Sequence, residues 1–394
     1  MDKEKELYLD NAATTAVYPE VVDTMLPYFS ELYGNPSSIY GFGARSKKAV
    51  DEAREIIAKS IGAKTEEIYF TAGGSESDNW ALVAMAQAYK DKGKHIITSK
   101  IEHHAILHTC EYLERNGFEV TYLDVDEKGF VNPKDVEAAI RPDTILISIM
   151  YANNEIGTIE PIGEIGKTAR THGVYFHTDA VQAYGHIPIN VDNENIDMLS
   201  ASAHKLHGPK GIGFLYIRKG IKMGSFIHGG AQERSRRAGT HNVPGIVGMG
   251  KAAELAMEHM KENMEHQIRV RDYFIENVQK EIPHVKVNGD LKRRLPNNIN
   301  VCFRFIEGES MLIMLDMKGI CASSGSACTS GSLEPSHVLL AIGLPHETAH
   351  GSLRLTISEE TTTEDMDYVL RELKAIVGRL RDMSPLYQDF ISKN

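Results

Sequence analysis

The sequence predicts an α/β protein, with a mostly parallel, seven-stranded β-sheet in a large domain followed by a smaller α+β domain. Short apolar runs rich in β-branched residues alternate with amphipathic stretches between residues 67 and 217, which is the pattern of strands joined by helices. After about residue 250, a long helical pattern leads into shorter strands, which indicates a second unit. The length of 394 residues is enough for about two to three domains.

Seven short runs are expected to form the large sheet. They are Ile68–Thr71, His95–Thr98, Glu119–Leu123, Thr144–Met150, Val174–His177, Met198–Ser200 and Gly213–Ile217. Because helical patterns separate successive runs, we expect neighbouring strands to be parallel and both faces of the sheet to be covered by helices. Ligands bind such sheets beyond the carboxyl ends of the strands, so the residues that follow each run are the candidates for a site.

The remaining patterned segments define the helices and the second domain. The expected helices and later strands are Ser77–Tyr89, Ala105–Asn116, Pro133–Ile140, Ile162–His172, Ala252–Ile282, Val285–Val287, Asn298–Phe305 and Asp365–Met383. We predict a large domain of residues 16–255 and a small domain made of residues 1–15 and 256–394.

Composition excludes several classes of protein. A formal charge of -11 argues against nucleic acid or an anionic membrane as the main partner. The sequence contains neither a signal-peptide pattern nor a run of about 18 apolar residues, so we expect no secretion signal and no membrane span. The four cysteines are too few and too scattered for a disulfide framework, which predicts a reduced, cytoplasmic protein.

Lys205 is the first candidate catalytic residue. It follows Ser202, Ala203 and His204 and precedes the turn at Gly208-Pro209. Small neighbours let a phosphate or a ring approach the backbone, and an amine in this place suits a Schiff base with an aldehyde cofactor. The alternative is a surface lysine in a glycine-rich turn, and the motif by itself favours that alternative.

Two further segments that follow strands add a phosphate cradle and an acid. Gly73, Gly74 and Ser75 open an expected helix, where free backbone N–H groups face an anion. Asp179 follows another strand and could keep a pyridine nitrogen protonated, although it could equally cap the next helix. A phosphate cradle, a pyridinium partner and a Schiff-base lysine together predict pyridoxal 5'-phosphate as the cofactor.

Taken as a whole, the chain resembles the cysteine desulfurases of the NifS/IscS type, which are fold-type I pyridoxal-phosphate enzymes of the class V aminotransferase family. The matching motifs run nearly from end to end: Tyr8–Thr15, Gly34–Ser38, Glu102–Ala105, Asn153–Thr158, His177–Gln182, Ser200–Gly211 and Ser323–Gly331. The resemblance implies a homodimer that converts L-cysteine to L-alanine. It also implies that the sulfur is held as a persulfide and donated to an acceptor protein, for iron–sulfur cluster or other thio-cofactor synthesis.

The resemblance also implies a role for each matching residue. The phosphate would be held by Gly74, Ser75, Ser202 and His204. Asp179 would face the pyridine nitrogen, and Asn154 and Gln182 would lie near the ring hydroxyl. Thr240 would reach the phosphate of the partner subunit. His103 would stack on the ring and carry protons, Lys205 would bind the cofactor, and Arg354, with Asn154, would bind the substrate carboxylate. Ala231 and Ala238 depart from the family pattern, which puts the local backbone near the dimer interface in question.

Cys328 would select the reaction. Its small polar neighbours favour an accessible thiolate over a buried structural cysteine. We interpret the other three cysteines, Cys110, Cys302 and Cys321, as ordinary buried thiols.

A pattern that resembles a zinc-protease motif, His346–His350, lies between Pro345 and Gly351. The segment has little more than one turn to present both histidines, so we predict no metal site.

Three alternatives remain at this stage. An aminotransferase needs no loop cysteine, whereas a selenocysteine lyase is harder to exclude. A regulatory protein without turnover would be expected to have lost the lysine or gained a DNA-binding segment. The tail Met383–Phe390 resembles a segment that docks an iron–sulfur scaffold, with a frayed terminus as the alternative.

Overall fold

The computed structural model describes residues 6–324 and 335–393. The larger of its sheets has seven strands in the order β2-β8-β7-β6-β5-β3-β4. The strands are β2 (Ile68–Thr71), β3 (His95–Ser99), β4 (Glu119–Leu123), β5 (Thr144–Ser148), β6 (Tyr175–Asp179), β7 (Met198–Ser202) and β8 (Gly213–Ile217). Strand β8 is antiparallel to both of its neighbours, and the other pairings are parallel, which confirms the predicted fold class.

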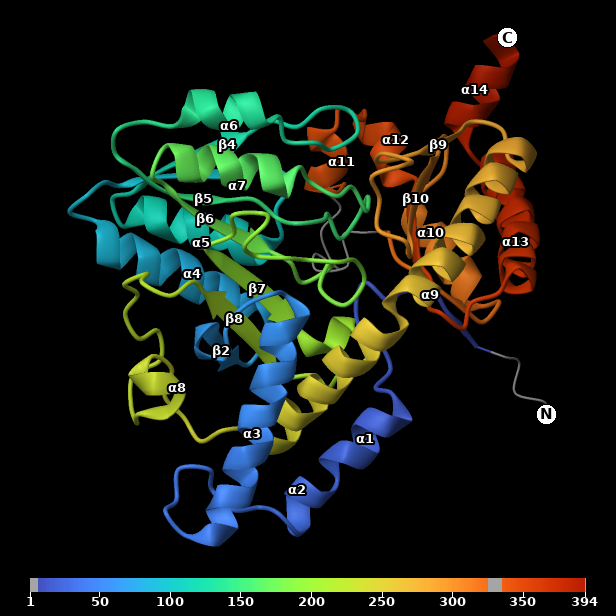
Figure 1. The fold of residues 1–394 in the computed structure, drawn as a ribbon. Helices are drawn as coiled ribbons and strands as arrows, with labels where there is room; N and C mark the ends of the chain where they lie inside the picture. The colour runs from blue at the N-terminus through green and yellow to red at the C-terminus, as the bar shows by residue number, and fades with distance from the viewer. Residues whose placement is uncertain (1–5, 325–334, 394) are drawn as a thin grey trace.

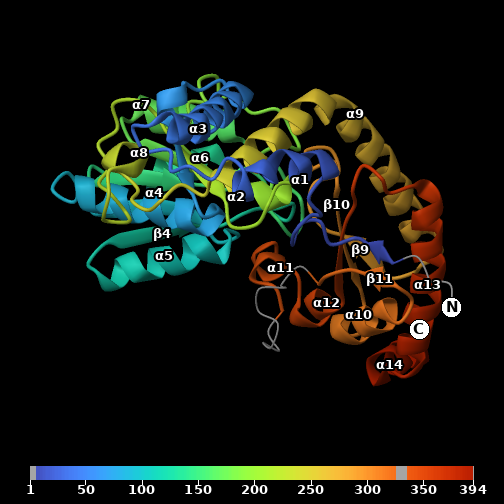
Figure 2. The same cartoon turned by 90° about the horizontal axis from the view of Figure 1, so that it is seen from below.

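Helices cover both faces of this sheet (Figures 1 and 2). One face packs against α3 (Gly41–Ser60), α6 (Pro133–Ala139), α7 (Ile162–Thr171) and the start of α9 (Val243–Glu281), and the other packs against α4 (Gly74–Tyr89) and α5 (His104–Arg115). Successive residues of a strand point to opposite faces: Phe214 packs in the first layer and Leu215 in the second. This two-sided burial explains why the strands appear in the sequence as continuous apolar runs.

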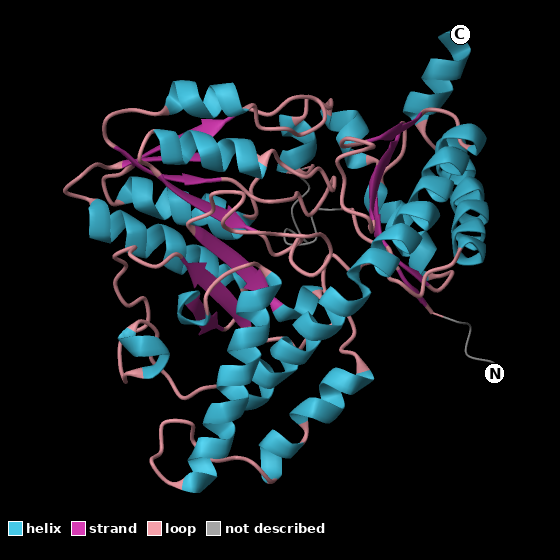
Figure 3. Ribbon diagram, in the orientation of Figure 1, coloured by secondary structure: helices cyan, strands magenta, loops and turns pink. Residues whose placement is uncertain are grey.

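The smaller unit is built on two short sheets beside the large one (Figure 3). Strands β9 (Val285–Val287), β10 (Asn298–Phe303) and β12 (Ser352–Thr356) form an antiparallel sheet, and β1 (Leu7–Tyr8) pairs in parallel with β11 (Ile320–Cys321). The helices of this unit are α10 (Gly308–Asp316), α11 (His337–Ala341), α12 (His346–His350), α13 (Thr363–Asp382) and α14 (Pro385–Lys393). Among the described residues, no helix combines the length and apolarity that crossing a bilayer requires.

The long helix α9 belongs to the cores of both units. Its first residues, including Ile246 and Met249, pack in the core beside the seven-stranded sheet, whereas Val270 and Phe274 pack in the core of the smaller unit. Figure 1 shows the helix running diagonally between the two. With 39 residues it is roughly 60 Å long, which gives the interface a rigid backbone.

Several boundaries differ from the sequence prediction, and for two of them the structure shows the physical reason. Helix α9 begins at Val243 rather than at residue 252, because glycines that look unfavourable in a helix are needed there for close packing. A Cβ at Gly250 would lie 2.7 Å from the Cβ of Ala53 on α3. Strand β10 ends at Phe303 rather than at residue 305, because Phe305 adopts a φ of 72° that a strand cannot contain.

The remaining elements connect these layers. They are α1 (Pro19–Met25), α2 (Pro27–Ser30), α8 (Gln232–Ser235) and the short 3₁₀ turns Thr65–Glu67 and Ala203–Lys205. The second of these turns follows β7 directly, so it places Lys205 at the carboxyl end of a parallel strand. This is the edge of the sheet where the sequence predicted a site.

Candidate active site

Ten of the predicted site residues line one cavity of about 440 Å³ at the carboxyl edge of the sheet. They are Gly74, Ser75, His103, Asn154, Asp179, Gln182, Ser202, His204, Lys205 and Arg354. The residues come from segments far apart in the chain, so their convergence was not visible in any local pattern.

The Lys205 amine is held at the wall of this cavity by backbone carbonyls. It donates hydrogen bonds to the carbonyl oxygens of Ala12 and Ala13, the latter at 2.8 Å. The carbonyl of Lys205 itself accepts a bond from His186 Nε2 at 2.8 Å. The alternative of a surface lysine is therefore wrong, because N-terminal residues fold back over the turn and enclose the amine.

Asp179 lies at the end of β6 and is buried. Its Oδ1 accepts a bond from the N–H of Val181 at 2.9 Å, and its other oxygen has no hydrogen-bond partner among the described residues. Burial raises the pKa of Asp179 to about 6, against the opposing effects of the Val181 N–H and the Lys205 charge. Residues 181–186 form turns, so the carboxylate does not cap a helix.

Asp78 is a second buried acid that the sequence analysis did not select. It lines the same cavity, and its Oδ1 has no hydrogen-bond partner in the described part of the chain. Burial, and then the negative charge of Asp179, raise the pKa of Asp78 well above its ordinary value. The two acids thus disfavour each other's charged form, and the stronger shift at Asp78 favours Asp179 as the carboxylate that faces a pyridinium nitrogen.

A phosphate cradle lies at the other end of the cavity. Gly73 has a φ of +151°, which favours glycine, and α4 begins at the next residue. A Cβ at Gly74 would lie 2.5 Å from Val181 Cγ2, so only glycine leaves the backbone open here. An adjoining hollow of about 430 Å³ shares Gly74, Ser75, Ser202 and His204 with the main cavity and is also lined by Lys210.

The two hollows fit pyridoxal phosphate. Helix N–H groups, hydroxyls and the Lys210 amine surround the space that a phosphate would fill. The Lys205 amine can bind an aldehyde, and the unbonded oxygen of Asp179 can pair with a ring nitrogen. These features come from this chain's geometry alone.

His103 has a structural role that the sequence analysis missed. It caps α5, with Nδ1 accepting a bond from the N–H of Ala105 at 3.1 Å. Burial, the charge of Lys205 and the neighbouring His104 lower the pKa of His103 to about 4. The ring is therefore neutral at pH 7, and because Nδ1 is an acceptor, the proton is on Nε2.

Arg354 lies on β12 and is only 3% exposed. Its guanidinium donates to Asp10 Oδ1 at 2.8 Å and to the carbonyl of Asn154 at 3.0 Å, while Nε has no partner among the described residues. Asp10, like the carbonyls of Ala12 and Ala13, was not selected from the sequence. All three lie in the N-terminal motif, and a backbone carbonyl carries no residue-type signal.

One predicted residue does not line this cavity, and another lies outside the described residues. Thr240 is exposed, follows α8 and does not line the cavity. Cys328 lies outside the described residues, although the chain on either side of residues 325–334 is anchored near the cavity. Ser323 exchanges backbone hydrogen bonds with Arg354, and the His337 ring contacts the carbonyl of Glu102 at 3.0 Å.

The three described cysteines differ in exposure. Cys110 and Cys302 are buried as predicted, and burial raises the pKa of both thiols, that of Cys302 to about 11. The prediction that Cys321 is buried is wrong, because it lies on the two-residue strand β11 at the margin of the smaller unit and is only partly covered. Burial also raises its pKa, so none of these three thiols is primed as a nucleophile.

The two residues that departed from the family pattern lie beside α8, whose backbone is irregular. Ala231 has φ −84° and ψ 15°, whereas Glu233, Arg234 and Ser235 have positive φ values of 45°, 57° and 62°, and Ala238 is buried. The zinc-protease pattern forms the five-residue helix α12, and no group of side chains in the described ranges could hold a metal ion.

Comparison with known proteins decides the family. The profile of the Aminotransferase class-V family matches residues 7–369. The chain belongs to this family. A protein named "Cysteine desulfurase IscS" from Clostridium botulinum is 58% identical over 389 residues, covering 98% of both chains. One of the same name from Methanosarcina thermophila is 60% identical over 382 residues, covering 97% of this chain and 94% of the relative.

Solved structures agree with this assignment. A structure titled "NIFS-LIKE PROTEIN" aligns with a TM-score of 0.90 and 38% identity, covering 95% of this chain and 100% of the other. "SspA in complex with cysteine" aligns with a TM-score of 0.81 and 39% identity, covering 90% and 100%. Within its family, this class-V member is a cysteine desulfurase of the NifS/IscS type, with the fold-type I architecture and pyridoxal phosphate as its cofactor.

Proposed function

We propose that this chain converts L-cysteine to L-alanine, collects the sulfur on Cys328 as a persulfide and passes it to an acceptor protein for iron–sulfur cluster or other thio-cofactor synthesis. The observation that carries the proposal is the convergence of the Lys205 amine, the Asp179 carboxylate and the Arg354 guanidinium on one cavity. In this proposal the Lys205 amine anchors the cofactor, the Asp179 carboxylate keeps its ring nitrogen protonated, and the Arg354 guanidinium binds the carboxylate of the amino acid.

Each residue has a defined task in this proposal. The bound cofactor supplies an electron-withdrawing ring next to the substrate Cα. Asp179 keeps the ring nitrogen protonated, and Arg354, beside Asn154, holds the substrate carboxylate. The Lys205 amine, at the wall of this cavity, would take the proton from the substrate Cα.

The sulfur leaves by nucleophilic attack. The Cys328 thiolate attacks the substrate Sγ, a sulfur–sulfur bond forms, and the electron pair of the Cβ–Sγ bond returns to the carbon skeleton, which is protonated to alanine. His103, which is neutral and has its proton on Nε2, carries a proton between the Cys328 thiol and the cofactor ring. The contacts of Ser323 with Arg354 and of His337 with Glu102, at the two ends of the Cys328 segment, support an approach of this segment to the cavity.

The other cofactor contacts complete the site. We propose that Gly74, Ser75, Ser202 and His204 hold the phosphate and that Gln182 and Asn154 lie near the ring hydroxyl. Their place on the cavity wall supports these roles.

We propose a homodimer in which Thr240 of the partner subunit completes the phosphate site. The exposure of Thr240, away from the cavity of its own chain, supports this role. Large apolar side chains are exposed on α2 and in the segment that leads to α3, among them Phe29, Tyr33, Ile39 and Tyr40, and exposed apolar surface of this kind is typical of an interface.

We also propose that residues 16–255 form one domain and residues 1–15 with 256–394 the other. The separate apolar cores on the two halves of α9 support this division, as does the packing of Leu7 and Leu9 in the smaller core.

We propose that α14 docks an iron–sulfur scaffold. The helix projects from the molecule, as Figure 1 shows, and its Leu386 and Ile391 are exposed. The ring centroids of Phe390 and Phe305 lie 4.8 Å apart, and this packing supports an ordered helix rather than a frayed end. A pull-down with an iron–sulfur scaffold should fail when residues 384–394 are deleted, while alanine formation continues. Undiminished capture by the truncated chain would remove this role.

Incubation of the purified holoenzyme with L-cysteine tests the activity. We expect alanine and a protein-bound persulfide in equal amounts in the first turnover. Cys328→Ala should retain the visible absorption of the bound cofactor yet form no persulfide, with Cys110→Ala as the matched control that forms it normally. Persulfide formation by Cys328→Ala would refute the assignment.

A further inference from the structure

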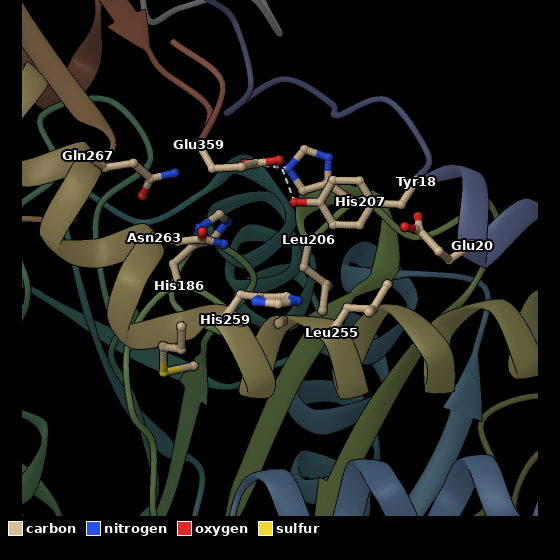
Figure 4. Close-up of a pocket in the computed structure, with 13 residues that line it drawn as sticks. Tyr18, Glu20, His186, Leu206, His207, Leu255, His259, Asn263, Gln267 and Glu359 are labelled. Atoms are coloured by element: carbon tan, nitrogen blue, oxygen red, sulfur yellow. Dashed lines mark hydrogen bonds and ion pairs between the residues drawn. The ribbon is translucent and has the colours of Figure 1, made fainter. Parts of the chain in front are cut away.

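A second cavity, of about 220 Å³, lies on the other side of the Lys205 turn (Figure 4). It is bounded by α9, by the turn that continues from Lys205 through Leu206 and His207, and by the loop that follows β12. Across its top, Glu359 of the smaller unit meets Tyr18 and His207 of the larger one, as Figure 4 shows. This contact joins the smaller unit to the larger one.

The bridge is made of three closely packed side chains. Tyr18 Oη donates a hydrogen bond to Glu359 Oε1 at 2.5 Å, and His207 Nε2 lies 3.4 Å from Glu359 Oε2. The rings of Tyr18 and His207 stack with their centroids 4.1 Å apart and 9° between their planes. Burial alone would raise the pKa of Glu359, but His207 and the Tyr18 hydroxyl lower it to about 2, so the carboxylate is charged at neutral pH.

Both nitrogens of the His207 ring face a partner. Nδ1 donates a hydrogen bond to the carbonyl oxygen of Ala16 at 2.9 Å, and Nε2 lies 3.4 Å from Glu359 Oε2. The ring is therefore fixed between the N-terminal segment and the loop that follows β12, with the charged carboxylate of Glu359 directly opposite Nε2.

The bridge is linked directly to the lysine on one side. His207 is two residues beyond Lys205, and its N–H donates to Thr15 Oγ1 at 2.9 Å. Thr15 also bonds the carbonyl of His204 through its own N–H at 2.9 Å. A shift of His207 therefore moves the turn that contains Lys205.

On the other side the bridge is linked to the residue that holds the substrate. Glu359 follows β12, the strand that carries Arg354, by a few residues. A cysteine substrate bears its amine and its carboxylate on the same carbon, so the separation of Lys205 and Arg354 must match that spacing. Displacements of about 1 Å in such an arrangement reduce rates by about a hundredfold.

We propose that Glu359 is a positioning residue that sets the distance between the Lys205 turn and the Arg354 strand through its bridge to Tyr18 and His207. The inference deepens the proposed function and rests on it. Glu359 touches neither the cofactor site nor the substrate site, so it acts through the two chain segments that it joins.

The test compares Glu359→Gln with Glu360→Gln. The first variant keeps an acceptor for the Tyr18 hydroxyl and loses the negative charge that faces His207 Nε2, whereas the second makes the same charge change one residue along, at an exposed side chain. We expect Glu359→Gln to raise KM for L-cysteine about three- to tenfold while cofactor content and absorption stay unchanged, and Glu360→Gln to match the wild type.

A double-variant cycle separates positioning from stability. His207→Gln should raise KM as much as Glu359→Gln, and the double variant should be no worse than either single one, because both remove the same contact. Glu359→Asp should recover part of the loss. A lower unfolding temperature with KM within twofold of the wild type would overturn the inference, as would an equal effect of Glu360→Gln.

A binding measurement distinguishes this inference from the proposed function. Titration of the holoenzyme with L-alanine, followed by the change in cofactor absorption, reports how well an amino acid spans the lysine turn and Arg354 without any desulfuration. We expect a weaker Kd for Glu359→Gln by the same factor as KM. If the wild type makes no alanine from cysteine, the proposed function fails; if Kd for L-alanine is unchanged in the variant, the positioning role fails.

Discussion

Replacement of Arg54 by methionine should strongly destabilise the protein. Arg54 on α3 forms a two-bond ion pair with Glu233, both bonds 2.7 Å long, and Glu233 is only 5% exposed. The same carboxylate accepts the N–H of Phe70 at 2.8 Å and contacts His241 Nε2 at 2.8 Å. Arg54→Met keeps the apolar length of the side chain and leaves a buried carboxylate without its main counter-ion.

The size of the expected loss in unfolding free energy follows from the pKa of the Glu233 carboxyl group. Burial alone would raise the pKa of Glu233, but hydrogen bonds from Arg54 and His241 lower it from 4.5 to about 2. A depression of about 2.5 units corresponds to about 3 kcal/mol at neutral pH. Removing one partner of a buried pair costs about 3–5 kcal/mol, in agreement with that figure.

Urea unfolding at pH 7 measures the effect. We expect Arg54→Met to lower the free energy of unfolding by about 3–5 kcal/mol, and Arg54→Met combined with Glu233→Gln to lower it by markedly less, because no charge is left unpaired. A loss below about 1 kcal/mol in the single variant, or simple addition in the double variant, would refute the reasoning.

The pH dependence gives an independent check of the same pair. The folded pKa of Glu233 is depressed, so its stabilising contribution is complete above pH 4.5 and is lost as the pH falls toward 2. The difference in unfolding free energy between the wild type and Arg54→Met should therefore shrink as the pH is lowered through this window. A difference that stays constant between pH 7 and pH 3 would exclude the charge of Glu233 as its source.

Three further predictions concern the site. Lys205→Ala should lose the visible absorption of the lysine-bound cofactor, recorded by spectrophotometry, and a retained band would remove its assignment. Arg354→Gln should raise KM for L-cysteine by about tenfold or more through loss of a charge-assisted pair, measured by initial rates, with unchanged cofactor absorption as the control. Asp78→Asn mimics the protonated acid and should keep kcat within about threefold, whereas Asp179→Asn should lower it by about a hundredfold or more; equal losses in the two variants would contradict the assignment of charge.

Strands β2, β3, β5, β7 and β8 of the large sheet were predictable because each is buried along its whole length, whereas β4 lies at the edge of the sheet and is partly exposed. Strands β2, β4 and β8 begin and end at the predicted residues, since apolar runs between helical patterns mark such strands clearly. The start of α9 was not predictable from local pattern, because Gly250 is unfavourable in an isolated helix and is favoured only by its contact with Ala53.

The site was predictable to the extent that residue type carries the chemistry. In their motifs, an amine, a carboxylate and a guanidinium have few other roles, and the structure places Lys205, Asp179 and Arg354 on one cavity. Asp78 was missed because its importance depends on a neighbour about 100 positions away, which raises its pKa only in the folded chain. The bonds of the Lys205 amine were missed because their acceptors are backbone carbonyls, which no side-chain pattern reveals.

The N-terminal segment has a consequence for how the protein is made. Its Asn11 side chain bonds the carbonyl of Thr356, 345 positions later, at 2.7 Å, and its Leu7 pairs with Ile320. Residues 7–11 therefore wait without these partners until residue 356 has been synthesised. Because Ala12 and Ala13 in the same segment hold the lysine amine, the catalytic pocket is completed only after that point. A nascent chain thus has no finished active site until these two distant segments meet.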